Sequence, residues 1–312
     1  MTARRARATG SPVPDASPAR SPLRPAVRLL RVHQWSKNLL LLVPPLGAHR
    51  LSADVLAPAL VGAAAFSLAA SSAYVVNDLL DREADRVHPV KARRPLAAGE
   101  LSPRAALALA AAALAAALAL ALTALPGFLG ALGVYWLVTV AYSVRLKRVP
   151  VLDVLVLAGL YALRILAGTL ATGVPTSAWL FTLAMFLFLS LALVKRTSEL
   201  RRMTAGAAAG LAARGRGYST ADLEILSMIG VASGLVAVLV LALYVASADV
   251  TRLYAHPERL WLLCPLGLYW VSRLWLLARR GAVDEDPVLF ALRDPPSWLV
   301  GALAAAVVVA GT

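Results

Sequence analysis

The chain has 312 residues, of which 60% are apolar, and a net charge of +14. A soluble domain is about 45–50% apolar, so the composition excludes an ordinary soluble fold and predicts an all-α integral membrane protein. The single cysteine, Cys264, excludes an internal disulfide and a cysteine-ligated metal cluster. Basic residues line the loops between apolar segments, so we interpret the charge as a determinant of membrane topology and expect no nucleic acid partner.

Residues 1–24 are rich in Arg, Pro, Ala and Ser without an apolar period, and they predict a disordered basic cytoplasmic tail. Residues 25–312 predict a single transmembrane domain. About nine spans are expected, of which the first and the last are short. The apolar segments occur at 33–50, 54–80, 104–125, 127–144, 151–172, 176–194, 223–247, 259–279 and 297–312.

Lysine and arginine are distributed unevenly between the two sets of loops. The loops after the second, fourth, sixth and eighth segments each hold several, whereas the opposite loops hold few. The positive-inside rule therefore places the N-terminus in the cytoplasm and the C-terminus outside, in a bacterial-type plasma (inner) membrane. An odd number of spans agrees with termini on opposite sides.

The second segment ends in Asn77-Asp78-Leu79-Leu80-Asp81-Arg82-Glu83-Ala84-Asp85. At about 100° per residue, Asn77, Asp78, Asp81 and Asp85 fall on one helix face. Three crowded carboxylates repel one another, and a divalent cation would relieve that repulsion. Oxygen ligands select Mg²⁺, Mn²⁺ or Ca²⁺, and Mg²⁺ usually completes its shell with water and substrate phosphates. These four residues therefore predict a metal site for a phosphorylated ligand.

The loop that follows runs from His88 to Gly99, and prolines at 89 and 95 interrupt any helix. It places Lys91 and Arg94 beside the carboxylates. Cations next to a metal–carboxylate site suit a diphosphate, whose charge exceeds what the metal cancels. The alternative is a solvated loop whose charges pair internally.

The run from Asn77 to Gly99 resembles the first aspartate-rich motif of the UbiA superfamily, NDxxDxxxD, followed by HPxKxxRPxAAG. The resemblance extends from Arg31 to about Asp294. It implies nine helices around a central cavity that opens sideways to lipid, with Mg²⁺ and a diphosphate at the aspartate motif. The implied catalytic residues are Asp78, Asp81, Asp85, Lys91 and Arg94.

Two further segments carry candidate phosphate ligands. The stretch from Tyr142 to Lys147 resembles the superfamily's YSxxLK segment, whose lysine reaches a phosphate; ordinary positive flanking of a span is the alternative. Arg164 lies eleven residues beyond Asp153 on the fifth span, which is about 16 Å deeper on nearly the same face. We expect Arg164, with Tyr161, to line the cavity. An internal salt bridge is the alternative.

The third interior loop is expected to open with Lys195-Arg196-Thr197-Ser198-Glu199-Leu200. Aromatic prenyltransferases of the superfamily usually carry a second motif of DxxxD type here, and this chain has only Glu199. It resembles instead the decaprenyl-phosphate phosphoribosyltransferase branch. The segment from Arg31 to Asn38 resembles that branch's RPxQWxKN opening, and the segment from Ala291 to Asp294 resembles its tail pattern.

This resemblance implies Mg²⁺-dependent transfer of 5-phosphoribose from phosphoribosyl diphosphate to a polyprenyl phosphate, with release of diphosphate. The alternative is prenyl transfer from a prenyl diphosphate to an aromatic or other acceptor. A carrier is disfavoured because most charges cluster at the cytoplasmic edge. The sequence leaves the oligomeric state open. The expected substrate-binding residues are Asn77, Lys37, Tyr142, Lys147, Tyr161, Arg164, Lys195, Arg196 and Glu199.

Overall fold

The computed structural model describes residues 23–88, 90–175, 177–205, 217–283 and 287–312. All of the regular structure in these ranges is helical. The predicted tail of residues 1–24 lies outside the described residues up to 22, whereas Leu23 and Arg24 belong to the first helix. The α-helices are α1 (Leu23–Leu30), α2 (Val43–Gly47), α3 (Ala53–Leu80), α4 (Arg82–Arg86), α5 (Pro103–Ala124), α6 (Leu129–Val144), α7 (Leu152–Thr172), α8 (Ala178–Ala205), α10 (Leu223–Val245), α11 (Ala248–Leu253), α12 (Leu263–Arg279), α13 (Pro287–Ala291) and α14 (Pro295–Gly311).

Short 3₁₀ segments extend several of these helices or join them. They are η1 (Val32–Leu42), η2 (Lys91–Arg93), η3 (Pro126–Phe128), η4 (Leu146–Arg148), η6 (Thr220–Asp222) and η7 (Pro257–Leu262). Each of the nine predicted apolar segments contains helical structure. Seven of the described helices are long and apolar enough to cross a membrane by themselves. The two short elements are the first, made of η1 and α2, and the last, α14, so the count of about nine spans is approximate.

One predicted boundary is wrong. The sixth segment was expected to end at residue 194 and to open into a loop, but α8 continues to Ala205. Lys195, Arg196 and Glu199 are therefore helical residues. Arg196 and its two successors are buried, so helix packing extends beyond the apolar run that sets the predicted limit.

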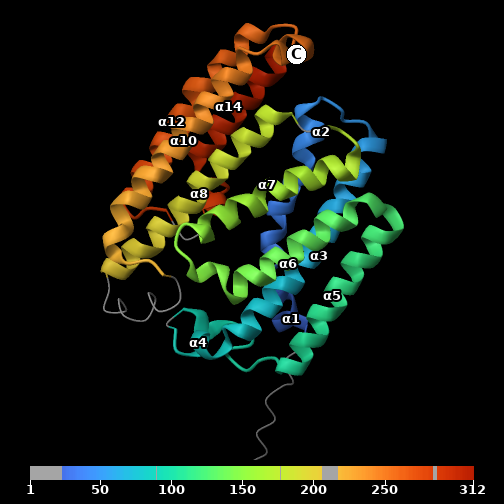
Figure 1. Ribbon diagram of the computed structural model, residues 1–312, viewed down its shortest axis with the longest axis vertical. Helices are drawn as coiled ribbons and strands as arrows, with labels where there is room; N and C mark the ends of the chain where they lie inside the picture. The colour runs from blue at the N-terminus through green and yellow to red at the C-terminus, as the bar shows by residue number, and fades with distance from the viewer. Residues whose placement is uncertain (1–22, 89, 176, 206–216, 284–286) are drawn as a thin grey trace, which may run out of the picture.

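The helices run lengthwise through the molecule between two ends (Figure 1). One end carries α1 and α4, and the C-terminus of α14 lies at the opposite end. α10, α12 and α14 lie along one side of the molecule, α3 and α5 lie along the other, and α7 crosses between them. This arrangement brings the start of α7 and the end of α3 towards the same end of the molecule.

α5 packs against α3 through a stripe of small residues. Ser102 caps the helix by accepting the Ala105 N–H at 3.2 Å, and Pro103 occupies its first turn. The buried positions recur every three or four residues, which places them on one face. They are all alanines: Ala106, Ala110, Ala113, Ala117 and Ala121. These small side chains allow α5 to pack closely against α3.

A second close approach joins α7 to η1. A Cβ atom added to Gly168 would lie 2.3 Å from the backbone oxygen of Leu41, so only glycine allows the two segments to approach this closely. The contact fixes η1 beside α7. It therefore positions Asn38, which lies on η1 and is 1% exposed.

We expect Gly168→Ala to destabilise the protein by about 1–3 kcal/mol, because overpacking of a well-packed contact forces the backbone to shift. Thermal unfolding in detergent measures the effect. Gly159→Ala is the matched control on the same helix, since no atom lies within 4 Å of its added Cβ. An equal melting temperature for Gly168→Ala and the wild-type protein would contradict the close contact.

Candidate active site

The aspartate-rich segment stays helical through a change of element. α3 ends at Leu80 and α4 begins at Arg82, yet two backbone hydrogen bonds span the junction. The backbone N–H of Asp81 donates to the backbone oxygen of Asn77 at 2.9 Å, and that of Asp85 donates to the backbone oxygen of Asp81 at 2.8 Å. These are helical i to i−4 bonds. The predicted common face of Asn77, Asp81 and Asp85 is therefore retained by the backbone.

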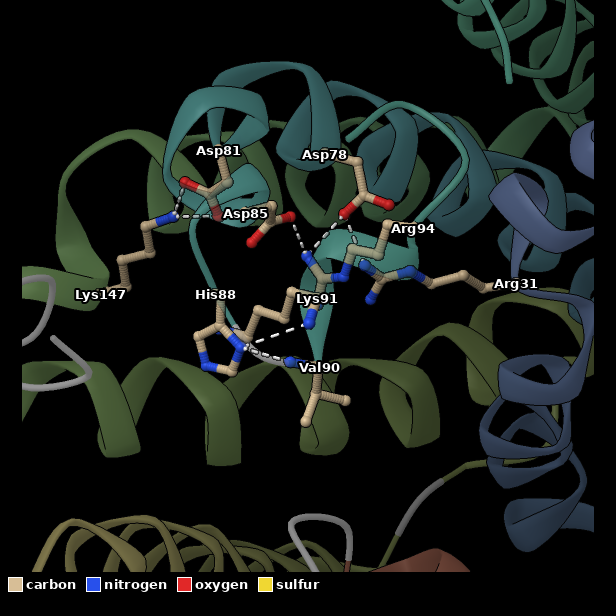
Figure 2. Close-up of polar contacts among 9 residues, drawn as sticks. All are labelled: Arg31, Asp78, Asp81, Asp85, His88, Val90, Lys91, Arg94 and Lys147. Atoms are coloured by element: carbon tan, nitrogen blue, oxygen red, sulfur yellow. Dashed lines mark hydrogen bonds and ion pairs between the residues drawn. The ribbon is translucent and has the colours of Figure 1, made fainter. Parts of the chain in front are cut away.

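The three aspartates lie together at the α4 end of the molecule, and each binds a basic side chain (Figure 2). Asp78 Oδ1 accepts from Arg94 at 3.1 Å, and Asp85 Oδ2 accepts from the same Arg94 nitrogen at 2.7 Å. Lys147 Nζ lies 2.8 Å from both oxygens of Asp81. Residues expected separately from the motif loop and from the YSxxLK segment thus meet at one site.

A third cation comes from the N-terminal region. Arg31 follows α1 with a positive φ of 51°, and its guanidinium donates to Asp78 Oδ1 at 2.6 Å. Its guanidinium also lies 5.1 Å from the centre of the Tyr74 ring. Arg31 was not among the expected site residues, although it opens the segment that resembles RPxQWxKN. The signal in the sequence that could have identified Arg31 is its place at the start of the segment from Arg31 to Asn38.

The formal charges of the three carboxylates are balanced by Arg31, Arg94 and Lys147. The side chains of Asp78 and Asp85 are 3% and 6% exposed, whereas that of Asp81 is 32% exposed. Within the described ranges, no three His, Cys, Asp or Glu side chains are close enough to share a metal ion. Asp78, Asp81 and Asp85 thus form ion pairs in this structure, and the metal site predicted at Asn77, Asp78, Asp81 and Asp85 stays a prediction.

Two other expected residues flank this cluster. Lys91 begins η2 and is half-buried, and its N–H donates to His88 Nδ1 at 3.3 Å. Tyr142 is half-buried in the last turn of α6, close enough to interact electrostatically with Arg196. Lys91 lies beside the ion-paired aspartates (Figure 2), because η2 packs against α4, whereas the interaction of Tyr142 is with Arg196 of α8.

A second polar cluster forms between η1, α6 and α7. Arg164 is 5% exposed and donates to Asn38 Oδ1 at 2.9 Å, to the Tyr135 hydroxyl at 3.0 Å and to the Leu160 oxygen at 2.7 Å. Tyr161 lies on one side, with its ring centre 5.2 Å from the guanidinium carbon. None of these partners is a carboxylate, so the alternative of an internal salt bridge for Arg164 finds no support in the described part of the chain.

Lys37 belongs to the same region, because its Nζ lies 6.0 Å from the centre of the Tyr161 ring. Asn38 also donates to Ser67 Oγ at 2.9 Å, which connects the cluster to α3. Asn38, Tyr135 and Ser67 were not predicted. They sit in apolar segments as isolated polar residues, and only the packing of three helices brings them together.

A third cluster contains Arg196 and Glu199 of α8. The Arg196 guanidinium binds Asp153 and Glu199, and the Tyr218 hydroxyl donates to Asp153. Asp153 is 0% exposed and Arg196 is 2% exposed. Burial and the adjacent Asp153 carboxylate raise the pKa of the Tyr218 hydroxyl, so it stays protonated. Arg196 and Glu199 therefore belong to a buried ion-pair network here, and half-buried Lys195 precedes them on the same helix.

Residues 46–293 match the UbiA prenyltransferase family model, and the chain belongs to that family. It is a multi-pass membrane protein with the UbiA fold and is a transferase by family.

Two relatives extend this finding. An uncharacterised protein named y4nM, from Sinorhizobium fredii, is 39% identical over 97% of this chain, which spans 59% of that protein. The decaprenyl-phosphate phosphoribosyltransferase of Mycolicibacterium smegmatis is 36% identical over 60% of this chain and 61% of that protein. The chain thus spans about three-fifths of the length of each of these relatives.

The fold also matches a UbiA homologue from Archaeoglobus fulgidus whose structure was determined bound to GPP and Mg²⁺. The TM-score is 0.66 at 21% identity, and the match covers 91% of this chain and 99% of that one. The predicted UbiA-like arrangement of helices is confirmed.

Proposed function

We propose that this chain transfers 5-phosphoribose from phosphoribosyl diphosphate to a polyprenyl phosphate and releases diphosphate. The observation that carries the proposal is the cluster of three aspartates and three basic side chains at the α4 end of the molecule. The 36% identity to a decaprenyl-phosphate phosphoribosyltransferase supports the choice of donor and acceptor.

The residues fit a magnesium ion. Carboxylate and amide oxygens are its preferred ligands, and it commonly takes only one or two carboxylates together with phosphate oxygens. The half-exposed Asp81 is the most accessible carboxylate of the cluster, and Asn77 precedes it by one helical turn. Asp78 and Asp85 complete the proposed set of ligands. The ion would draw negative charge towards the leaving diphosphate.

In this proposal the basic side chains of the cluster bind the diphosphate as well as the carboxylates. Arg31, Arg94 and Lys147 bind carboxylates that would turn to the metal, so their N–H groups become available to diphosphate oxygens. Lys91 adds a further cation beside them. Donors aimed at the leaving group stabilise the charge that develops in the transition state.

The proposed reaction needs no general base. An ionised oxygen of the lipid phosphate forms the new bond to ribose C1. The bond between C1 and the diphosphate oxygen breaks, and the diphosphate leaves with the electron pair. Seven further residues remain proposed substrate-binding residues, either by contact or through the residues that they position. They are Lys37, Tyr142, Tyr161, Arg164, Lys195, Arg196 and Glu199.

Prenyl transfer is the second candidate, and the family description favours it. The relative from Archaeoglobus fulgidus binds GPP and Mg²⁺, a prenyl diphosphate with a divalent ion. Against this candidate, α8 offers Glu199 rather than a pair of aspartates, and Arg196 binds that glutamate. The distribution of basic loops supports a proposed orientation in the bacterial inner membrane, with the N-terminus and this site on the cytoplasmic side and the C-terminus outside.

A transfer assay on purified protein in detergent with Mg²⁺ tests the proposal. One reaction receives phosphoribosyl diphosphate labelled in the ribose together with polyprenyl phosphate, and the other receives a labelled prenyl diphosphate with an aromatic acid. We expect label to enter lipid in the first reaction and EDTA to abolish the transfer. Transfer in the second reaction alone would overturn the phosphoribosyl proposal in favour of prenyl transfer.

A further inference from the structure

Arg164 occupies a buried position on α7 in a span that is apolar enough to cross the membrane. A full charge at such a position is costly, and it usually faces a polar partner or a ligand. None of the contacts of Arg164 in the described part of the chain is a carboxylate. Its partners are the amide of Asn38, the hydroxyl of Tyr135 and the backbone oxygen of Leu160, which are all neutral.

The guanidinium is held in a fixed orientation but is not saturated. Three hydrogen bonds use three of its five N–H donors. The rings of Tyr135 and Tyr161 lie 4.8 and 5.2 Å from its central carbon. Ring faces stabilise a cation without neutralising it. One N–H of Nη1 and one of Nη2 therefore remain for a ligand, and guanidinium N–H groups suit a phosphate or carboxylate.

This position is separate from the aspartate cluster. Ser67, which binds Asn38, lies eleven residues before Asp78 on α3, a rise of about 16 Å along the helix. Arg164 bends back towards the start of α7, because it donates to the oxygen of Leu160 four residues earlier. The guanidinium is linked to Ser67 through Asn38, and none of its hydrogen-bond partners is a carboxylate that could bind a metal.

We infer that Arg164 forms a phosphate-monoester subsite that is distinct from the diphosphate subsite at the aspartates. This inference rests on the proposed function, which requires two such phosphates: the 5-phosphate of the donor and the phosphate of the polyprenyl acceptor. A diphosphate with its metal needs the carboxylates, whereas a monoester needs only a cation and hydrogen-bond donors. Arg164 supplies both, and the Lys37 Nζ lies 6.0 Å from the centre of the same Tyr161 ring.

Binding measurements test the subsite without depending on turnover. Purified protein is titrated with ribose 5-phosphate, with undecaprenyl phosphate and with Mg²⁺–diphosphate, and ligand binding is followed by native mass spectrometry. We expect Arg164→Met to weaken binding of one monoester at least tenfold and to leave Mg²⁺–diphosphate binding within twofold. The monoester that loses affinity identifies the source of the phosphate.

Two variants separate charge from structure. Arg164→Lys keeps the cation and is expected to bind that monoester with intermediate affinity. Tyr135→Phe removes a neutral hydrogen bond but keeps the cation, and is expected to bind within about threefold of wild type. Equal losses for all three probes, no loss for either monoester, or wild-type protein that binds neither monoester would overturn the subsite. Selective loss in a protein that transfers no phosphoribose would retain the subsite and reject the proposed reaction.

Discussion

Asp81→Asn is expected to lower the transfer rate at least about 100-fold, the scale of losing one group that stabilises developing charge in a transition state. Asp81 is the most exposed of the three aspartates, at 32%, and both of its oxygens lie 2.8 Å from Lys147. It is therefore the carboxylate that an incoming metal–diphosphate complex can reach first. Initial rates at rising Mg²⁺ concentrations measure the loss.

The same substitution should hardly change stability. A partly exposed ion pair contributes about 0–1 kcal/mol, so the melting temperature of Asp81→Asn is expected to stay close to that of wild type. Glu83→Gln is the matched control, because Glu83 is two residues away, 74% exposed and paired with Arg82 and Arg86 rather than with a residue of the cluster. Wild-type rates for Asp81→Asn, or an equal loss for Glu83→Gln, would remove the aspartate cluster from the reaction.

The sequence predicted the aspartate cluster because helical periodicity places close neighbours on one face. The structure brings the carboxylates together with Arg94 and Lys147 as ion pairs, and the roles of these residues at a metal and a phosphate stay predictions. Arg31 was missed because its contact with Asp78 spans 47 residues and depends on how η1 packs against α3. Local periodicity contains no information about such a contact.

The end of α8 shows where hydropathy fails to predict a helix boundary. Hydropathy ends the sixth segment at residue 194, since charged residues follow it, yet Arg196 is buried because Asp153 and Glu199 neutralise its charge. The partner of Arg196 is Asp153, 43 residues earlier, and Tyr218 comes from a segment that follows α8. A charged stretch was therefore predicted to be a loop when the fold uses it as packed helix.

Arg196→Met is expected to destabilise the protein by about 3–5 kcal/mol, the largest stability effect among these variants. Removing one partner of a buried ion pair leaves the remaining charge uncompensated. Here both Asp153 and Glu199 would lose their cation, and Asp153 is completely buried. Thermal unfolding in detergent, monitored by circular dichroism, measures the loss as a lower melting temperature.

The double variant Asp153→Asn with Arg196→Met separates a buried charge from a lost substrate contact. It removes the uncompensated carboxylate, so it should recover part of the stability lost in Arg196→Met alone. Arg145→Met is the control for loss of an exposed arginine, and its melting temperature should match wild type. If Arg196→Met melts like wild type but binds substrate weakly, the guanidinium must meet substrate directly. In that case arginine would be required at this position for its contact with the ligand and not for its ion pair with Asp153.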